Sequence, residues 1–362
     1  MRLGVFTPTG NNGWIASATS PQYLPTFELN RSVTQRAESY GFDFSLCMVK
    51  FRGFGGEIKF WDYTLETFTL MSALAAVTDQ IRIYCSVGVL SLHPAMVARM
   101  ASTIDSVAPG RFGINIVSGW NRQEYAQMGL WPGDEYYEYR YDYASEYVAV
   151  MKELWERGQS DFRGRFFQLE DCRLGPQPSA HIDILAAGAS LRGRQFAAEH
   201  ADFNFTSSPT GVDGLHQANA ELAAASAATG RTVQTILLTS VVLDDTDELA
   251  RKKVEHYSEG TDLVAAANRR AEYARDYTGV SSARGAQRLA NPKAKETSGA
   301  LIGSPRTVAD QLNRLAAVPG TGGILMSFDD YHEGLDRFGT EVIPLLEFDI
   351  ADHTPTVHAA TA

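Results

Sequence analysis

The sequence predicts a TIM (β/α)8 barrel, an α/β fold, because strand-like and helix-like segments alternate eight times along one chain of 362 residues. Strands that are joined by helices run parallel and cross over right-handed, and eight repeats in an unbroken series close such a sheet into a barrel. A doubly wound sheet also alternates strands with helices, but its GxGxxG fingerprint is missing between any strand and helix. The barrel is therefore the favoured fold.

Short β-branched or aromatic runs mark the expected strands, and segments of helical periodicity follow each of them. The strands are Leu3–Thr7, Phe42–Met48, Ile81–Val89, Phe112–Ser118, Ile182–Ala187, Phe203–Thr206, Thr235–Leu243 and Gly323–Phe328. The helices that follow them are Thr26–Tyr40, Thr64–Thr78, Pro94–Val107, Glu138–Arg157, Ser190–His200, Gly214–Thr229, Thr246–Tyr257 and Gly334–Leu346, with one more over Arg306–Ala316.

Several of these helices carry start signals. Pro94 and Pro305 stand where a first-turn N–H is not needed, and the Thr246 hydroxyl precedes two acidic residues that suit the positive helix end. Gly41 and Gly230 follow the ends of two other helices. The limits of these helices are therefore predicted by local chemistry as well as by periodicity.

We expect a single domain over residues 1–350, with insertions at the C-terminal face of the strands. Residues 260–303 separate the last two strands and predict a lid over the barrel mouth. Residues 351–362 are small and polar, which is typical of a disordered tail.

The amino-acid composition excludes some classes of binding partner. The chain has 32 Lys and Arg against 43 Asp and Glu, a net charge of −11, which repels nucleic acid and anionic membranes. Its three cysteines are widely spaced, and its N-terminus lacks the apolar run of a signal peptide. We expect a cytoplasmic protein that forms homo-oligomers.

In a TIM barrel the active site lies at the carboxyl ends of the strands, which nominates a set of polar residues. Asn115 lies inside an apolar strand, where an unpaired amide would cost about 1–3 kcal/mol, so either a ligand or neighbouring backbone must satisfy it. Ser86 lies within the preceding strand. Lys50 comes just after another expected strand, Phe42–Met48, and it either holds a ligand or is an ordinary surface lysine.

A phosphate site is a second candidate. Ser190 opens a helix directly after a strand, where free N–H groups suit a phosphate, although an ordinary N-cap explains the same pattern. Arg140 lies among tyrosines and has the fork geometry for a phosphate, or else belongs to a solvated helix face.

The residue patterns that other kinds of catalytic site require are missing from the sequence. The histidines are scattered, so no metal site is expected; no GxSxG elbow is present; and no convincing carboxylate pair for glycoside hydrolysis is found. The remaining polar and aromatic mouth is typical of a barrel in which a cofactor performs the reaction.

The sequence resembles the bacterial pyrimidine monooxygenases of the uracil-utilisation pathway, which belong to the bacterial-luciferase-like flavin monooxygenases. The likeness runs from Met1 to about Leu346. The motifs that carry it are Gly10-Asn11-Asn12-Gly13-Trp14, Arg52-Gly53-Phe54-Gly55-Gly56, Phe60-Trp61-Asp62, Trp131-Pro132-Gly133-Asp134, Arg140-Tyr141-Asp142-Tyr143 and Phe328-Asp329-Asp330.

This resemblance implies FMN that is reduced by a separate NADH-dependent flavin reductase, with O2 as co-substrate. It implies that a flavin peroxide opens uracil or thymine between N3 and C4, giving a ureidoacrylate-type product. The implied FMN contacts are Val49, Lys50, Asn115, Glu124, Arg140, Tyr141 and Ser190.

The same resemblance suggests roles around the flavin. Asn115 and Ser86 are the expected catalytic residues, which would hold O2 and the reactive flavin edge. The expected substrate-binding residues are Met48, Trp120, Glu124 and Phe328.

This chain departs from the family near the mouth. It has Ser86 in place of a threonine, Val87-Gly88-Val89 in place of a run of small residues, and a different loop over residues 207–211. These changes leave open another heterocyclic amide or a sulfur compound as substrate, and a non-catalytic flavin-binding protein as the alternative class.

Overall fold

Eight parallel strands close into a barrel in the computed structural model, which describes residues 1–207, 211–276 and 299–351. The closed order is β1, β2, β3, β4, β7, β8, β9 and β11, because β11 pairs with both β9 and β1 and the pairing of β8 with β9 closes the ring. Their bounds are Arg2–Phe6, Phe44–Leu46, Arg82–Gly88, Phe112–Val117, Asp183–Ala187, Phe203–Ser207, Gln234–Leu243 and Thr321–Phe328. The predicted TIM barrel is confirmed.

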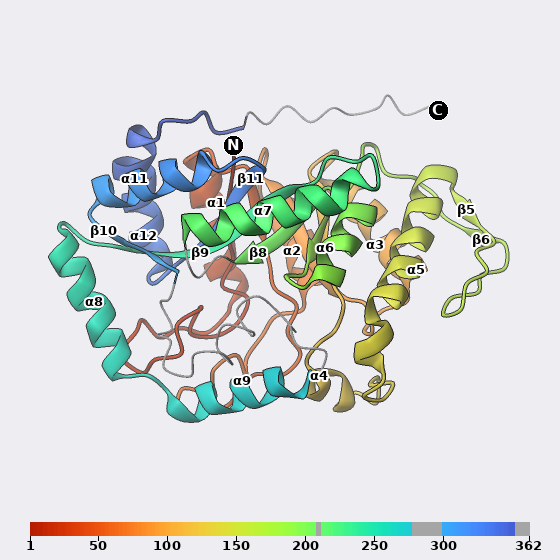
Figure 1. Cartoon of the computed structure of the whole chain (residues 1–362), viewed down its shortest axis with the longest axis horizontal. Coiled ribbons are helices and arrows are strands. Elements are labelled where there is room, and N and C mark those ends of the chain that lie inside the picture. The colour runs from red at the N-terminus through yellow and green to blue at the C-terminus, as the bar shows by residue number, and fades with distance from the viewer. Residues whose placement is uncertain (208–210, 277–298, 352–362) are drawn as a thin grey trace.

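Helices surround the barrel (Figure 1). Those that match predicted helices are α1 (Phe27–Ser39), α2 (Thr67–Ala75), α3 (Pro94–Val107), α5 (Tyr136–Arg157), α6 (Leu191–His200), α7 (Val212–Ala227), α8 (Asp247–Glu259) and α11 (Pro305–Ala316). The Thr246 side chain caps α8 as expected, and Pro94 and Pro305 lie in the first turns of α3 and α11. The His93 side chain also caps α3, which the sequence had not indicated. The predicted last helix is shorter, because α12 (Tyr331–Arg337) continues as a π-helical turn, Phe338–Val342, and a 3-10 turn, Ile343–Leu345.

Within the described residues, four smaller elements were not assigned as such from the sequence. They are α4 (Arg122–Ala126), the two-stranded β5 (Gln159–Ser160) and β6 (Cys172–Arg173), and β10 (Leu301–Gly303), which extends the sheet beside β9. Short segments such as these carry too few residues for a periodic signal.

Side chains alternate between the two faces of each strand and so form two hydrophobic cores, one inside the barrel and one between the barrel and the helices. Phe44, Tyr84 and Leu325 belong to a cluster inside the barrel, whereas Ile83, Ile114 and Ile324 pack outward against the helices. The inner positions of β3 and β4 continue toward the mouth as Ser86 and Asn115, since successive side chains alternate between the faces.

The longest described element of the predicted lid is the helix α9 (Leu263–Arg275), which lies along the same end of the barrel as α4 (Figure 1). The strand β10 is a second part of it. Asp262 caps α9 and also accepts from the Ile58 N–H at 3.0 Å. Asn268 donates to the Phe54 carbonyl at 2.8 Å. These bonds tie α9 to the segment after β2. Residues 277–298 of the predicted lid and 352–362 of the predicted tail lie outside the described residues.

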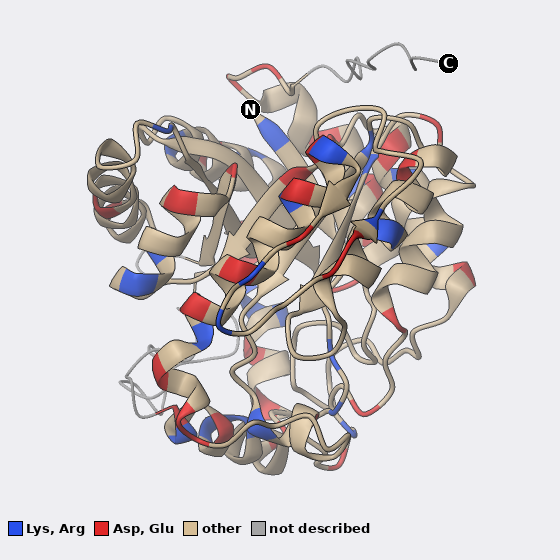
Figure 2. Cartoon of the chain, turned by 90° about the vertical axis from the view of Figure 1, so that its right-hand side faces the viewer, with Lys and Arg blue, Asp and Glu red and all other residues tan. Residues whose placement is uncertain are grey.

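Positions of Lys and Arg are interspersed with positions of Asp and Glu along the backbone in Figure 2. Across the described residues, no helix is both long and apolar enough to span a bilayer.

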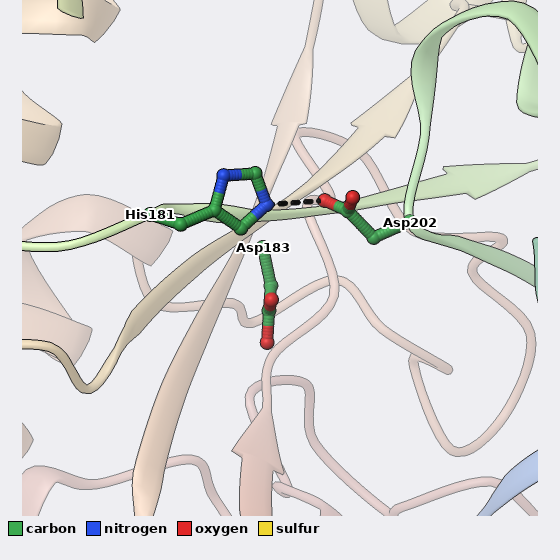
Figure 3. Close-up of side chains that lie close together, drawn as sticks. All are labelled: His181, Asp183 and Asp202. Atoms are coloured by element: carbon green, nitrogen blue, oxygen red, sulfur yellow. Dashed lines mark hydrogen bonds and ion pairs between the residues drawn. The ribbon is translucent and has the colours of Figure 1, made fainter. Parts of the chain in front are cut away.

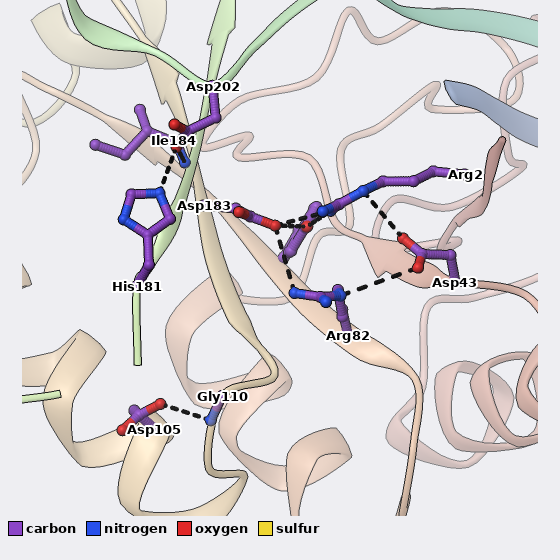
Figure 4. Close-up of polar contacts among 10 residues, drawn as sticks. Arg2, Asp43, Arg82, Asp105, Gly110, His181, Asp183, Ile184 and Asp202 are labelled. Atoms are coloured by element: carbon purple, nitrogen blue, oxygen red, sulfur yellow. Dashed lines mark hydrogen bonds and ion pairs between the residues drawn. The ribbon is translucent and has the colours of Figure 1, made fainter. Parts of the chain in front are cut away.

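A charged network closes the other end of the barrel (Figure 4). Asp183 accepts from Arg2 Nη1 at 2.7 Å and from the Tyr84 hydroxyl, and Arg82 Nη1 lies 3.6 Å from the same carboxylate. Asp43 pairs with both arginines at 3.7 and 3.9 Å. Burial and the Asp183 carboxylate raise the pKa of Tyr84 well above its usual value, so its hydroxyl stays a donor.

We predict that Asp183→Asn lowers the free energy of unfolding by about 2 kcal/mol, because two partly buried arginines lose one of the two carboxylates that they share. Urea unfolding followed by circular dichroism measures the change. Glu248→Gln is the matched control, since Glu248 and Lys252 form an exposed pair and its loss should change little. Equal effects of the two substitutions would show that the network contributes no more than a surface pair.

Candidate active site

A cavity opens at the carboxyl ends of the strands, at the mouth that α9 covers. Seven of the residues nominated from the sequence line it: Met48, Val49, Lys50, Ser86, Asn115, Trp120 and Glu124. They come from three places, namely the segment after β2, the inner faces of β3 and β4, and the segment that includes α4. The fold therefore brings together residues that are up to 76 positions apart.

Ser86 and Asn115 form the polar floor of the cavity. They are direct neighbours in the register of β3 and β4, and both are almost fully buried. Asn115 Nδ2 donates to Ser86 Oγ at 2.9 Å, and Ser86 Oγ donates to the Cys47 carbonyl at 2.5 Å. Asn115 Oδ1 has no hydrogen-bond partner among the described residues. A buried acceptor of this kind calls for a donor from a ligand.

A buried ion pair forms one side of the cavity. Lys50 Nζ contacts Glu124 Oε1, and the two side chains are 4% and 7% exposed. Asn121 Nδ2 also donates to Oε1 at 2.9 Å. The ammonium lies 4.4 Å from the centre of the Phe54 ring, within the range of a cation–π contact. Lys50 is thus part of the cavity wall rather than a surface lysine.

Aromatic rings form the other walls. Trp120 stacks on Tyr273 of α9, with ring centres 4.7 Å apart and planes inclined by 28°. Trp14 also lines the cavity. Tyr125 is buried beside them, and burial, followed by the Glu124 charge, raises the pKa of its phenol. These flat apolar surfaces limit water and suit a planar ligand.

Arg140, Tyr141 and Ser190 do not line this cavity but gather next to it. Arg140 Nη1 lies 2.7 Å from Asp276 Oδ2, and both side chains are buried. Ser190 Oγ accepts from the Gly193 N–H at 3.0 Å and so caps α6, as the N-cap interpretation expected. Ala187, at the end of the strand that leads to Ser190, lines the cavity, so the two places are continuous.

Glycines let the turn before α6 pack closely against the first turn of that helix and against Tyr141. A Cβ on Gly188 would lie 2.9 Å from the Gly193 Cα, closer than real Cβ contacts allow. A Cβ on Gly193 would lie 2.7 Å from the Tyr141 hydroxyl. The helix N-terminus, the tyrosine hydroxyl and the nearby arginine therefore provide donors that fit a phosphate group.

Phe328 lies elsewhere, which corrects its expected place in the substrate wall. Its side chain packs in the outer core, with ring centres 6.3 Å from Tyr331 and 5.7 Å from Phe338. The reason is strand alternation, because Phe328 shares a face of β11 with the outward-pointing Ile324 and Met326.

The cavity also includes residues that the sequence did not nominate, above all Arg269 and Tyr273. Both lie on α9, four residues apart, so they share one helix face. Helical periodicity could have shown that they lie together, but not that this face meets the barrel mouth.

One group of possible metal ligands lies at the opposite end of the barrel, where His181, Asp183 and Asp202 offer atoms within 4.8 Å of one another (Figure 3). Their ligand atoms are already engaged. His181 Nε2 and Asp202 Oδ2 are 2.9 Å apart, Asp202 also accepts from the Ile184 N–H, and Asp183 belongs to the arginine network. This group connects β7 to the start of β8.

We predict that Glu124→Gln destabilises the protein by about 3 kcal/mol, because it leaves the Lys50 ammonium buried without its counter-charge. Thermal and urea unfolding measure the loss. The double variant Lys50→Met/Glu124→Gln should lose less than the sum of the two single variants, since the first substitution removes the charge that the second strands. Strictly additive effects would contradict the pairing.

Comparison with known proteins places this chain among monooxygenases. The model of the luciferase-like monooxygenase family matches residues 1–321. Pyrimidine monooxygenases are similar along nearly the whole chain: that of Methylorubrum extorquens is 50% identical over 96% of each chain, and that of Enterobacter sp. is 48% identical over 99% of each.

Solved structures agree in fold. A riboflavin lyase superposes with a TM-score of 0.83 at 20% identity, over 95% of this chain and 91% of the lyase. A long-chain alkane monooxygenase gives a TM-score of 0.79 at 20% identity, over 98% and 94% of the two chains. The family model spans most of the sequence, and the chain therefore belongs to the luciferase-like monooxygenase family.

Proposed function

We propose that this protein binds FMN and uses reduced FMN and O2 to open the uracil or thymine ring between N3 and C4, giving a ureidoacrylate-type product. The 50% sequence identity to a pyrimidine monooxygenase supports this substrate. The observation that carries the proposal is the unsatisfied Asn115 amide oxygen, held at the floor of an aromatic cavity.

The residues fit a flavin in two parts. The cavity between Asn115, Lys50 and Trp120 suits the planar ring system, and Val49 and Glu124 line the same space. The start of α6, with Arg140, Tyr141 and Ser190 around it, suits the phosphate. Bound reduced FMN supplies the electrons with which O2 is activated for attack on a substrate carbonyl carbon.

Ser86 fixes the orientation of the Asn115 amide. The Ser86 hydroxyl donates its proton to the Cys47 carbonyl, so its oxygen is left as an acceptor for Asn115 Nδ2. This arrangement directs the amide NH2 to Ser86 and leaves Oδ1 to accept from a ring N–H. Asn115 thereby positions the reacting edge, and Ser86 acts through it.

A separate NADH-dependent reductase is the proposed source of reduced FMN. The sequence has no GxGxxG fingerprint for a nicotinamide dinucleotide, which supports delivery of flavin that is already reduced. The aromatic walls then serve to keep water from the reacting atoms.

The test is to mix the protein with reduced FMN and uracil without oxygen, and then to admit O2. We expect uracil to disappear and a ring-opened product to accumulate, as followed by chromatography with mass spectrometry. Reduced FMN without protein is the control. Normal FMN binding with unchanged uracil would favour another heterocyclic amide, and no oxygen-dependent turnover of any heterocycle would favour a non-catalytic flavin-binding protein.

We predict that Asn115→Ala retains FMN but lowers the rate of ring opening about 100-fold or more, because a positioned hydrogen-bond group at the reacting edge is lost. Fluorescence titration measures FMN binding, and uracil consumption at saturating FMN measures the rate. A variant that turned over uracil like the parent would remove Asn115 from the reaction.

We predict the opposite pattern for Arg140→Ala, in which FMN affinity falls about tenfold or more, while turnover at saturating FMN is less affected. The substitution also removes the partner of Asp276. The melting temperature is therefore measured alongside the FMN titration, and weakened binding counts only at temperatures where the variant is folded.

A further inference from the structure

The inner face of α9 forms a roof over the cavity. Ala265, Arg269 and Tyr273 follow one another at intervals of four residues and therefore lie on one side of the helix. Ala265 packs with Phe54 and Phe60, whereas Arg269 and Tyr273 line the cavity itself. α9 thus places one cation and one aromatic ring opposite the polar floor.

We propose that Arg269 is a substrate-binding residue, whose guanidinium donates hydrogen bonds to a carbonyl oxygen of a cyclic imide. The inference rests on the proposed function and assigns one side of its substrate site. It gives α9 a direct role in recognition in addition to covering the mouth.

The Arg269 side chain is held in place. It is 3% exposed, and its guanidinium carbon lies 5.4 Å from the centre of the Phe60 ring. The helix below it is anchored at its first turn by Asp262 and in its middle by Asn268. A guanidinium fixed in this way loses little freedom when it binds a ligand, so its hydrogen bonds favour affinity.

The hydrogen-bond donors of the lining favour a ligand rich in acceptors. Two cations, Lys50 and Arg269, and one anion, Glu124, line the cavity. Lys50 and Glu124 contact each other, and Glu124 also accepts from Asn121 and, at 3.4 Å, from the Phe51 N–H. The pair is neutral as a unit, and Arg269 adds to the lining a guanidinium, which has five N–H donors and no acceptor.

The shape of the lining selects among acceptors. The rings of Trp120 and Tyr273 stack on each other and line the same cavity as Arg269. Arginine is a donor only, with its N–H groups in one plane. A flat ring with carbonyl oxygens at its edge meets both conditions, which is the chemistry of a cyclic imide such as uracil.

Binding to the flavin-loaded protein tests the proposal without turnover. Uracil, 2-thiouracil and 4-thiouracil are titrated by equilibrium dialysis into the parent protein loaded with oxidised FMN. Sulfur accepts hydrogen bonds weakly, so we expect one of the two thio analogues to bind the parent less tightly than uracil does. Arg269→Gln should bind uracil about tenfold or more weakly. It should also lose most of the discrimination against that analogue.

Two further variants separate recognition from structure. Arg270→Gln is the matched control, because Arg270 is the next residue on α9 and does not line the cavity; it should bind uracil as the parent does. Arg269→Lys keeps the charge and should fall between the parent and Arg269→Gln. FMN affinity, measured by fluorescence, should stay within about twofold of the parent in Arg269→Gln, Arg269→Lys and Arg270→Gln. A tenfold loss of uracil affinity in Arg269→Gln is then specific to the substrate.

The outcomes distinguish this inference from the proposed function. If the parent consumes uracil but Arg269→Gln binds uracil and the thio analogues like the parent, Arg269 is not a substrate contact and the function stands. If Arg269→Gln is unfolded, equal binding of uracil and both thio analogues by the parent would overturn the inference. If the parent neither binds nor consumes uracil, the proposed function fails and the inference fails with it.

Discussion

Barrel closure is the constraint on which the rest of this structure depends. Eight parallel strands can close only if their carboxyl ends meet at one rim, so the polar residues at those ends are forced into one space. The same closure fixes the register that sets Ser86 beside Asn115. At the other rim it brings Arg2 and Arg82 together with Asp43 and Asp183, so that two positive charges meet two negative ones. One end is therefore closed by charge pairing and the other is left open to a ligand.

Two buried ion pairs then shape the open end. Taking charges out of water is expensive, and Lys50 with Glu124 or Arg140 with Asp276 offsets that cost only through close pairing. Each pair joins segments that are far apart in the sequence. Asp276 directly follows α9, so its pair ties the roof of the cavity to α5, beside the proposed phosphate site. Flavin binding and substrate binding are in this way built on shared supports.

Much of this arrangement could be predicted from the sequence. The strands and most helices follow from hydrophobic periodicity and capping, and the importance of Asn115 follows from an amide inside an apolar strand. Phe328 was misplaced although the same periodicity was available, because its face of β11 is that of Ile324 and Met326. Arg269 could not be found in this way, since local pattern gives the face of a helix but not what that face meets. Its position depends on long-range contacts such as that between Asn268 and Phe54.

The most direct measurement is a crystal structure with FMN and uracil bound. The account predicts that the flavin ring lies in the cavity with a ring N–H within hydrogen-bond distance of Asn115 Oδ1, and that the phosphate lies at the start of α6 near Arg140. A flavin whose ring lies outside this cavity, or whose phosphate lies away from α6, would contradict it.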